Sequence, residues 1–212
     1  MADISVIEVY GSSWTEFILS SQASSNTGRY CTYDHADPSV IGTNYPIRVP
    51  TAGNGWNNTD YNYSYWKTHF LKITGWGAGD TEIKNVRWCT DGSLGWGTGV
   101  TLWIAKSGNT YNWGLPSSQY SQATGIEKTT GNPFWSTVGG KEGHPYYRDV
   151  ANCSSNATTY DSNNYFWVMS GASNKITGNG YSWGVVTQVQ VGTDATHGLK
   201  DPETFTWVYD II

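Results

Sequence analysis

Charged residues are scarce in this chain, and long hydrophobic runs are missing. Only 14% of its 212 residues are Asp, Glu, Lys or Arg, and the formal net charge is −5. The sequence has no basic stripe to neutralise a phosphate backbone, which argues against nucleic-acid binding. No apolar run approaches the ~18–20 residues of a membrane-spanning helix. The sequence therefore predicts neither a nucleic-acid partner nor a membrane partner.

Cysteine is also rare, with three residues in the whole chain. Their odd number and wide spacing fit neither a closed disulfide framework nor a zinc site. The N-terminus, M-A-D-I-S-V-I-E-V-Y, lacks the basic region and the apolar stretch of a secretory signal. We therefore expect Cys31, Cys89 and Cys153 to be free thiols in a chain that folds in a reducing cytoplasm.

Recognisable catalytic motifs are missing as well. The sequence contains no G-x-S-x-G elbow, and its four histidines stand in unrelated contexts. Nucleophilic catalysis needs a base within hydrogen-bond reach of the nucleophile, and glycoside hydrolysis needs two carboxylates that flank a cleft. The sequence therefore predicts that the protein is not an enzyme, with a hydrolase as a minor alternative.

Aromatic and β-branched residues are abundant, in contrast to these absences. The chain holds 12 Trp, 15 Tyr and 5 Phe, together with 25 Gly, and strong helix formers are few. Such a composition favours strands over helices. We predict an all-β protein, an antiparallel β-sandwich of jelly-roll-like form with long loops rich in Gly, Asn and aromatic residues. A single domain over residues 1–212 accommodates it.

The clearest strand patterns lie in the last quarter of the chain. Residues 183–191 read W-G-V-V-T-Q-V-Q-V, and residues 203–210 read E-T-F-T-W-V-Y-D. Side chains of a strand alternate between its two faces, so both segments have the pattern of half-buried strands. We expect Val185, Val189, Phe205 and Trp207 to be buried.

Other segments predict the remaining strands. Residues 4–10, 63–74, 81–90, 100–105 and 164–170 are β-prone. Residues 45–50 can form only a short or edge strand, because each of their two prolines removes a ladder donor. Residues 63–74 and 81–90 are expected to pair with each other, antiparallel across a short loop. Residues 106–159 form a loop-rich insertion with short strands and a turn of helix.

Tryptophans in the loops are the first candidate contact residues. Trp56, Trp96 and Trp113 lie in stretches rich in Gly and Asn, where an aromatic ring is easily exposed. Exposed rings could stack on a sugar or contact another subunit, whereas packing over the ends of the sandwich is the alternative. We keep these three as candidates for ligand or subunit contact.

A second candidate site is the segment D-H-A-D at residues 34–37. Asp34, His35 and Asp37 place three possible metal ligands within four residues. Calcium prefers loops rich in oxygen ligands, which makes Ca²⁺ the possible cofactor. The alternative is an Asx-turn before Pro38, in which the aspartate binds its own backbone.

Two stretches of the chain resemble a known group of proteins. Residues 65–105 include T-E-I-K-N-V-R-W-C-T-D-G and G-V-T-L-W-I-A, and the chain ends V-T-Q-V-Q-V-G-T-D-A-T-H-G-L-K-D-P-E-T-F-T-W-V-Y-D-I-I. These segments are similar to uncharacterised proteins of tailed phages and prophages, which share a "GVTLY"-like strand and a final "ETFTWxYDE"-like strand. The ending Y-D-I-I departs from that pattern, and the insertion at 106–159 has no counterpart in it.

The resemblance implies a structural component of a virion, assembled in the host cytoplasm. Its motifs are structural and carry over no site residues. On this view the protein is a capsid decoration, neck, tail or fibre subunit that binds other copies of itself or a shell protein. A carbohydrate-binding β-sandwich module or a host-recognition adhesin, with surface glycans as partners, is the alternative.

Overall fold

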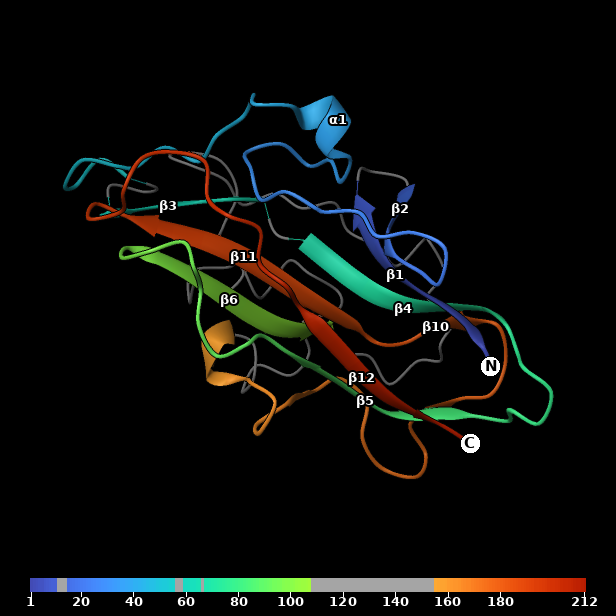
Figure 1. Cartoon of the computed structure of the whole chain (residues 1–212). Helices are drawn as coiled ribbons and strands as arrows, with labels where there is room; N and C mark the ends of the chain where they lie inside the picture. Colours follow the sequence, from blue (N-terminus) through green and yellow to red (C-terminus); the bar gives the residue numbers. More distant parts are fainter. Residues whose placement is uncertain (11–14, 56–58, 66, 108–154) are drawn as a thin grey trace.

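The computed structural model describes residues 1–10, 15–55, 59–65, 67–107 and 155–212. Their regular secondary structure is almost entirely antiparallel β-strand, as the sequence predicts. Figure 1 shows both termini on the same side of the molecule, near the ends of β1 (Asp3–Tyr10) and β12 (Thr206–Ile211). No helix among the described residues is long and apolar enough to cross a membrane.

The larger sheet has eight strands. Its main path runs β2 (Thr15–Ser20), β1, β4 (Lys67–Gly75), β11 (Gly184–Gly192), β6 (Val100–Ser107) and β7 (Ser155–Asn156). Two short strands join from the side: β3 (Tyr61–Tyr63) pairs with β11, and β10 (Gly180–Tyr181) pairs with β4. Strands distant in the sequence are therefore neighbours in this sheet.

The smaller sheet has four strands. Strand β5 (Ile83–Cys89) lies at its centre, with β12 along one side and both β8 (Phe166–Trp167) and β9 (Lys175–Ile176) along the other. Figure 1 shows β12 and β5 side by side, and buried residues of both sheets form one hydrophobic core. The described residues thus form a two-layered β-sandwich.

The main hydrophobic core lies between these two sheets. Leu71 of β4, Leu102 of β6 and Val185 of β11 contribute from the larger sheet, and Val86 and Trp88 of β5 contribute from the smaller one. All five side chains are fully buried. Burial of apolar area at about 25 cal/mol per Å² makes this inter-sheet layer the main source of stability.

Strand β11 differs from the sequence-based expectation of a half-buried strand. All nine of its residues are buried, on both faces of the sheet. Val185, Val189 and Val191 face the core, as the alternation predicts. On the other face Gln188 and Gln190 are buried too, and their amides bind the Ser64 carbonyl and the Tyr63 hydroxyl. Both amides can be buried because they have hydrogen-bond partners. The alternation of polar and apolar residues therefore predicted a half-exposed strand, although β11 is a central strand buried on both faces.

The pairing predicted for residues 63–74 and 81–90 is wrong. Strand β4 pairs with β1, β10 and β11 in the larger sheet, whereas β5 pairs with β12, β8 and β9 in the smaller one. The segment G-W-G-A-G-D between them therefore crosses from one sheet to the other. Residues 45–50, a candidate edge strand, form no strand.

The unequal sheets bear on the predicted topology. A jelly roll distributes eight strands over two sheets as two Greek keys, whereas the described residues form sheets of eight and four strands. The β-sandwich is confirmed, and the jelly-roll form stays a prediction.

The structure describes only the two ends of the insertion predicted at 106–159. Lys106 and Ser107 end strand β6, and strand β7 and the 3-10 turn Ala157–Thr159 lie at the other end. Residues 108–154 lie outside the described residues.

Candidate functional site

The outer face of the smaller sheet carries an aromatic and charged surface. Arg87 of β5 lies directly opposite Trp167 of β8. Its guanidinium carbon is 5.5 Å from the centre of the Trp167 ring and 5.2 Å from that of Tyr165. Val86 and Trp88, the neighbours of Arg87, point into the core, so Arg87 points outward. Cation–π attraction of this kind stabilises by about 0.5–1 kcal/mol at an exposed site.

Two further residues fix the arginine in place. Asp210 of β12 accepts a hydrogen bond from Nη2 of Arg87 at 3.0 Å and another from Nδ2 of Asn85 at 2.7 Å. Asn85 has a positive φ of 52°, a left-handed conformation that Asn tolerates better than most residues. The pairing of β5 with β12 shifts register at this point, between Val208 and Asp210. Tyr209 and Ile211 pack against the core, so Asp210 between them points outward, beside the guanidinium.

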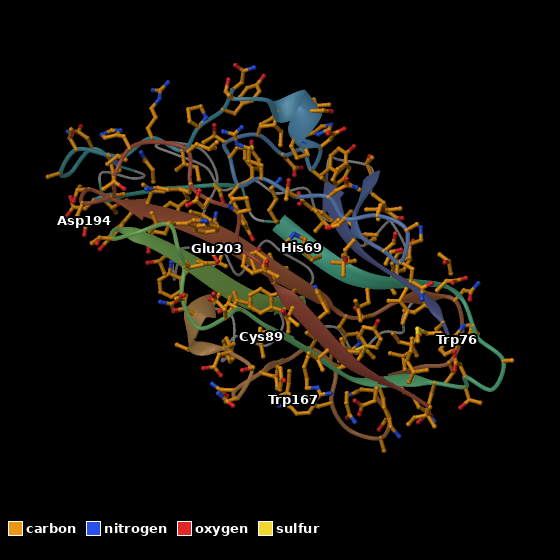
Figure 2. All side chains as sticks on the ribbon, in the orientation of Figure 1. His69, Trp76, Cys89, Trp167, Asp194 and Glu203 are labelled. Atoms are coloured by element: carbon orange, nitrogen blue, oxygen red, sulfur yellow. The ribbon has the colours of Figure 1, made fainter. Side chains whose placement is uncertain are left out.

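We call these five residues (Asn85, Arg87, Tyr165, Trp167 and Asp210) the Arg87 face. The Trp167 side chain remains 45% exposed. Figure 2 shows Trp167 at the margin of the molecule, beyond β5, whereas His69 lies near the start of β4. A large ring held beside a fixed guanidinium offers a partner a rigid contact with little side-chain entropy left to lose.

A second cluster of functional groups lies inside the molecule, on the inner face of the larger sheet. Glu8 of β1 pairs across the sheet with His69 of β4, and Lys67 lies two residues before His69. Lys67 Nζ is 2.8 Å from Glu8 Oε1, and His69 Nε2 is 3.5 Å from Glu8 Oε2. The Lys67 and Glu8 side chains are only 2% and 1% exposed. An ion pair thus occupies a position where the core would otherwise hold apolar side chains.

The chain between β2 and β3 covers this cluster. Lys67 Nζ donates to the His35 carbonyl at 2.7 Å, and the hydroxyls of Tyr30 and Thr187 are 2.5 Å apart. A Cβ at Gly28 would lie 2.7 Å from Glu8 Oε2, so only glycine lets the backbone approach so closely. Solvent therefore has almost no access to the ion pair.

Burial and charge act in opposite directions on the acid of this cluster. Burial alone would raise the pKa of Glu8, but the positive charge of Lys67 and the neighbouring His69 outweigh it, and the pKa lies below its usual value. Burial raises the pKa of the Tyr30 hydroxyl and that of the Cys31 thiol. Glu8 is therefore ionised at neutral pH, whereas Tyr30 and Cys31 keep their protons.

No family model, no curated protein and no solved structure matches this chain.

Of the three tryptophans that the sequence singled out, the structure describes Trp96, which belongs to neither site. Trp96 is 8% exposed and belongs to the core. Its Nε1 donates to the Asp201 carbonyl at 2.8 Å, and its ring makes an edge contact with Tyr30. Trp96 therefore packs within the protein, which is the alternative to the exposed ligand or subunit contact. Trp56 and Trp113 lie outside the described residues.

The three possible metal ligands at residues 34–37 have other contacts. Asp37 Oδ1 accepts from the Ser39 amide at 2.8 Å and caps the short helix α1 (Pro38–Ile41), which is the Asx arrangement expected before Pro38. His35 Nδ1 accepts from the Asp37 amide at 3.1 Å, and Asp34 is buried. Across the part of the chain that the structure describes, no group of three or more His, Cys, Asp and Glu side chains is arranged to hold a metal ion.

Sequence reasoning missed the residues of both sites. Trp167 stands in N-Y-F-W-V-M-S, where a strand of the core was expected, and only the alternation between Phe166 and Trp167 could have placed one ring inside and the other outside. Glu8 and Lys67 stand within predicted strands, where a charged residue usually marks the solvent face. Their separation in sequence hid the fact that β1 and β4 are neighbours.

Proposed function

We propose that the protein is a non-enzymatic structural subunit of a virion, which binds other copies of itself or a shell protein through the Arg87 face. The observation that carries this proposal is the half-exposed Trp167 ring beside the fixed guanidinium of Arg87. Trp, Tyr and Arg are the residue types that dominate binding energy at protein interfaces. The Arg87 face presents all three on one rigid sheet.

The position of this face in the chain agrees with the resemblance to phage proteins. Arg87 lies in one of the two resembling segments, and Asp210 lies in the other. The strands that carry them, β5 and β12, are neighbours in the smaller sheet. A group of structural proteins that shares these two segments would also share the two strands that carry this surface. Repetition around a symmetric particle would turn a weak contact at each face into firm attachment.

The test of this proposal is attachment to the particle. Purified particles should contain the protein in many copies, and recombinant protein should bind particles that lack it or assemble with itself. The variant Trp167→Ala should lose this binding by at least tenfold, as expected when an interface residue that contributes more than ~1.4 kcal/mol is truncated. Tyr61→Ala, which removes a ring of similar exposure (43%) on the larger sheet, is the matched control.

The outcomes of this test are distinct. Loss of binding in Trp167→Ala with retention in Tyr61→Ala supports the proposal. Equal binding by both variants would show that the Arg87 face takes no part in assembly. A protein that stays monomeric, ignores the particle and turns over a substrate would contradict the whole proposal.

A glycan-binding role, as a carbohydrate-binding module or host-recognition adhesin, is the second candidate, and one observation favours it. Arg87 is neutralised by Asp210 through their ion pair at 3.0 Å, so the face around Trp167 attracts neither anions nor cations strongly. A neutral sugar ring could stack on the exposed indole and bind the polar groups of Asn85 and Asp210. A glycan array with the wild type and Trp167→Ala distinguishes this candidate from protein binding.

A further inference from the structure

The buried ion pair of Glu8 and Lys67 has a geometry that a simple salt bridge does not require. Nζ approaches Oε1 to 2.8 Å, yet Oε1 has no partner within the angles of a hydrogen bond. The amine is held from another side by its donation to the His35 carbonyl. An amine and a carboxyl group are thus fixed against each other inside the protein, on two neighbouring strands.

The surroundings favour removal of these charges. Each charge that is buried away from water carries a desolvation penalty, and replacing a buried ion pair by neutral groups of similar volume is often neutral or stabilising. Condensation of the two groups gives a neutral amide and removes both charges at once. Groups held in place can also react as if their concentration were about 10⁵–10⁸ M, so that condensation can compete with the reverse hydrolysis in a site closed to water.

We propose that Lys67 and Glu8 condense to an intramolecular isopeptide bond that joins β1 to β4. One proton passes from Nζ to the carboxylate, which leaves a neutral amine and a carboxylic acid. The nitrogen lone pair then forms a bond to Cδ of Glu8, and the bond from Cδ to one carboxyl oxygen breaks. That oxygen leaves as water with two of the three protons that Nζ carried at the start, so no oxidant or co-reactant is required.

His69 lies where it can assist this reaction. Its Nε2 is 3.5 Å from Oε2 of Glu8, so the imidazole can pass a proton from the lysine nitrogen to the oxygen that leaves. In the resting state the pair is ionised, because the charges around Glu8 lower its pKa. The neutral, reactive pair is then a minor species, so the bond should form slowly after folding.

A second lysine–glutamate pair in the same sheet provides an internal control. Lys72 of β4 binds Glu16 of β2, but these side chains are 32% and 21% exposed. Water screens and solvates this pair, so its charges carry a smaller penalty, and water remains available to reverse a condensation. We therefore expect Lys72 and Glu16 to remain an ordinary salt bridge.

Mass spectrometry of the full chain tests this inference. After overnight incubation at physiological temperature, the intact protein should be lighter than its sequence by one water molecule. Trypsin should leave Lys67 uncut and release one species that joins residues 1–29 to residues 49–72. A link from Glu16 to Lys72 would instead join residues 1–29 to residues 68–84, and we expect none.

Two variants complete the test. Lys67→Met keeps an unbranched side chain of similar length and should abolish the loss of water, whereas Lys72→Met should leave it complete. Folding of each variant is checked by circular dichroism. If the wild-type protein keeps its full mass and trypsin cuts after Lys67, the inference is overturned and the pair is a salt bridge only. The inference is also overturned if the Lys67→Met variant, folded or not, still loses one water.

Discussion

The two described cysteines show how burial controls the chemistry of a single residue. Cys31 and Cys89 are buried free thiols. Burial raises the pKa of both, and for Cys89 the charge of Asp161 adds to the effect. Since the thiolate is the reactive form, both sulfurs are poor nucleophiles in the folded state. The free thiols agree with the expectation for these two positions, while Cys153 lies outside the described residues.

Native alkylation should therefore be slow at these cysteines. With iodoacetamide at pH 8, the peptides that contain Cys31 and Cys89 should be modified at least tenfold more slowly in the native protein than in urea, since closure protects them until the structure opens. Mass spectrometry of the two peptides over time measures both rates. Rapid labelling of Cys31 without urea would mean that the segment between β2 and β3 does not close over the ion pair.

For single residues, the sequence predicted local motifs better than roles that depend on contacts between distant strands. Asp37 was correctly linked to an Asx arrangement before Pro38, because that motif is local in the chain. Trp167, Glu8 and Lys67 were missed, because their roles depend on strands that meet only after folding. Arg87 gave no signal at all, since a lone basic residue in a strand is ordinary until its neighbours across the sheet are known.

At the scale of elements, a charge cluster ties β9 to β5. Glu82, just before β5, binds Lys175 of β9 at 2.6 Å and Lys84 of β5 at 3.0 Å. Hydrogen bonds from Lys175 and then Lys84 lower the pKa of Glu82 below its ordinary value of 4.5. A lowered pKa means that this contribution to stability is present above about pH 4.5 and is lost as the pH falls through the lower, folded-state value.

The variant Glu82→Gln should report this contribution. At pH 7 its urea midpoint should lie below that of the wild type, because the neutral amide cannot compensate two lysines. As the pH falls below 4.5, the difference between the two midpoints should shrink, because the wild-type carboxylate gains its proton. A difference that does not shrink on acidification would show that glutamine disturbs packing there instead.

Most of the long strands were predictable from the sequence. Each of β1, β4, β5, β6, β11 and β12 overlaps a segment whose β-prone pattern predicted it, whereas β2 was not predicted. Strands of two residues, such as β8 and β9, are too short to show an alternation. Partners were harder still, because the pairing of β4 with β1 and β11 depends on the whole sheet and not on the nearest strand in sequence.

At the scale of the whole molecule, stability depends on the layer of side chains between the sheets. Trp88 is fully buried there and packs against Phe205, with ring centres 5.2 Å apart. Trp207 of β12 and Phe205 just before it were both expected from the sequence to be buried, and both are half-buried. Val185 and Val189 are buried, as predicted. The strand at the edge of the smaller sheet thus exposes part of its aromatic face.

These exposures rank two tryptophan variants. Trp88→Ala should lower the free energy of unfolding by about 3–5 kcal/mol, because it leaves a large cavity in the core. Trp207→Ala should lower it by about half as much, since part of the ring is already in contact with water. Urea unfolding followed by fluorescence of the remaining tryptophans measures both. Equal losses would place Trp207 as deep in the core as Trp88.

The central position of β11 also dictates when the protein can fold during its own synthesis. Residues 184–192 lie between β4 and β6, although the ribosome makes them long after both. Until they emerge, the facing edges of β4 and β6 lack their partner, and an open strand edge invites pairing with another nascent chain. Crowding of ribosomes on one message would bring such edges together. Slow translation after β6 would therefore increase the demand for chaperones, whereas rapid completion of β11 would relieve it.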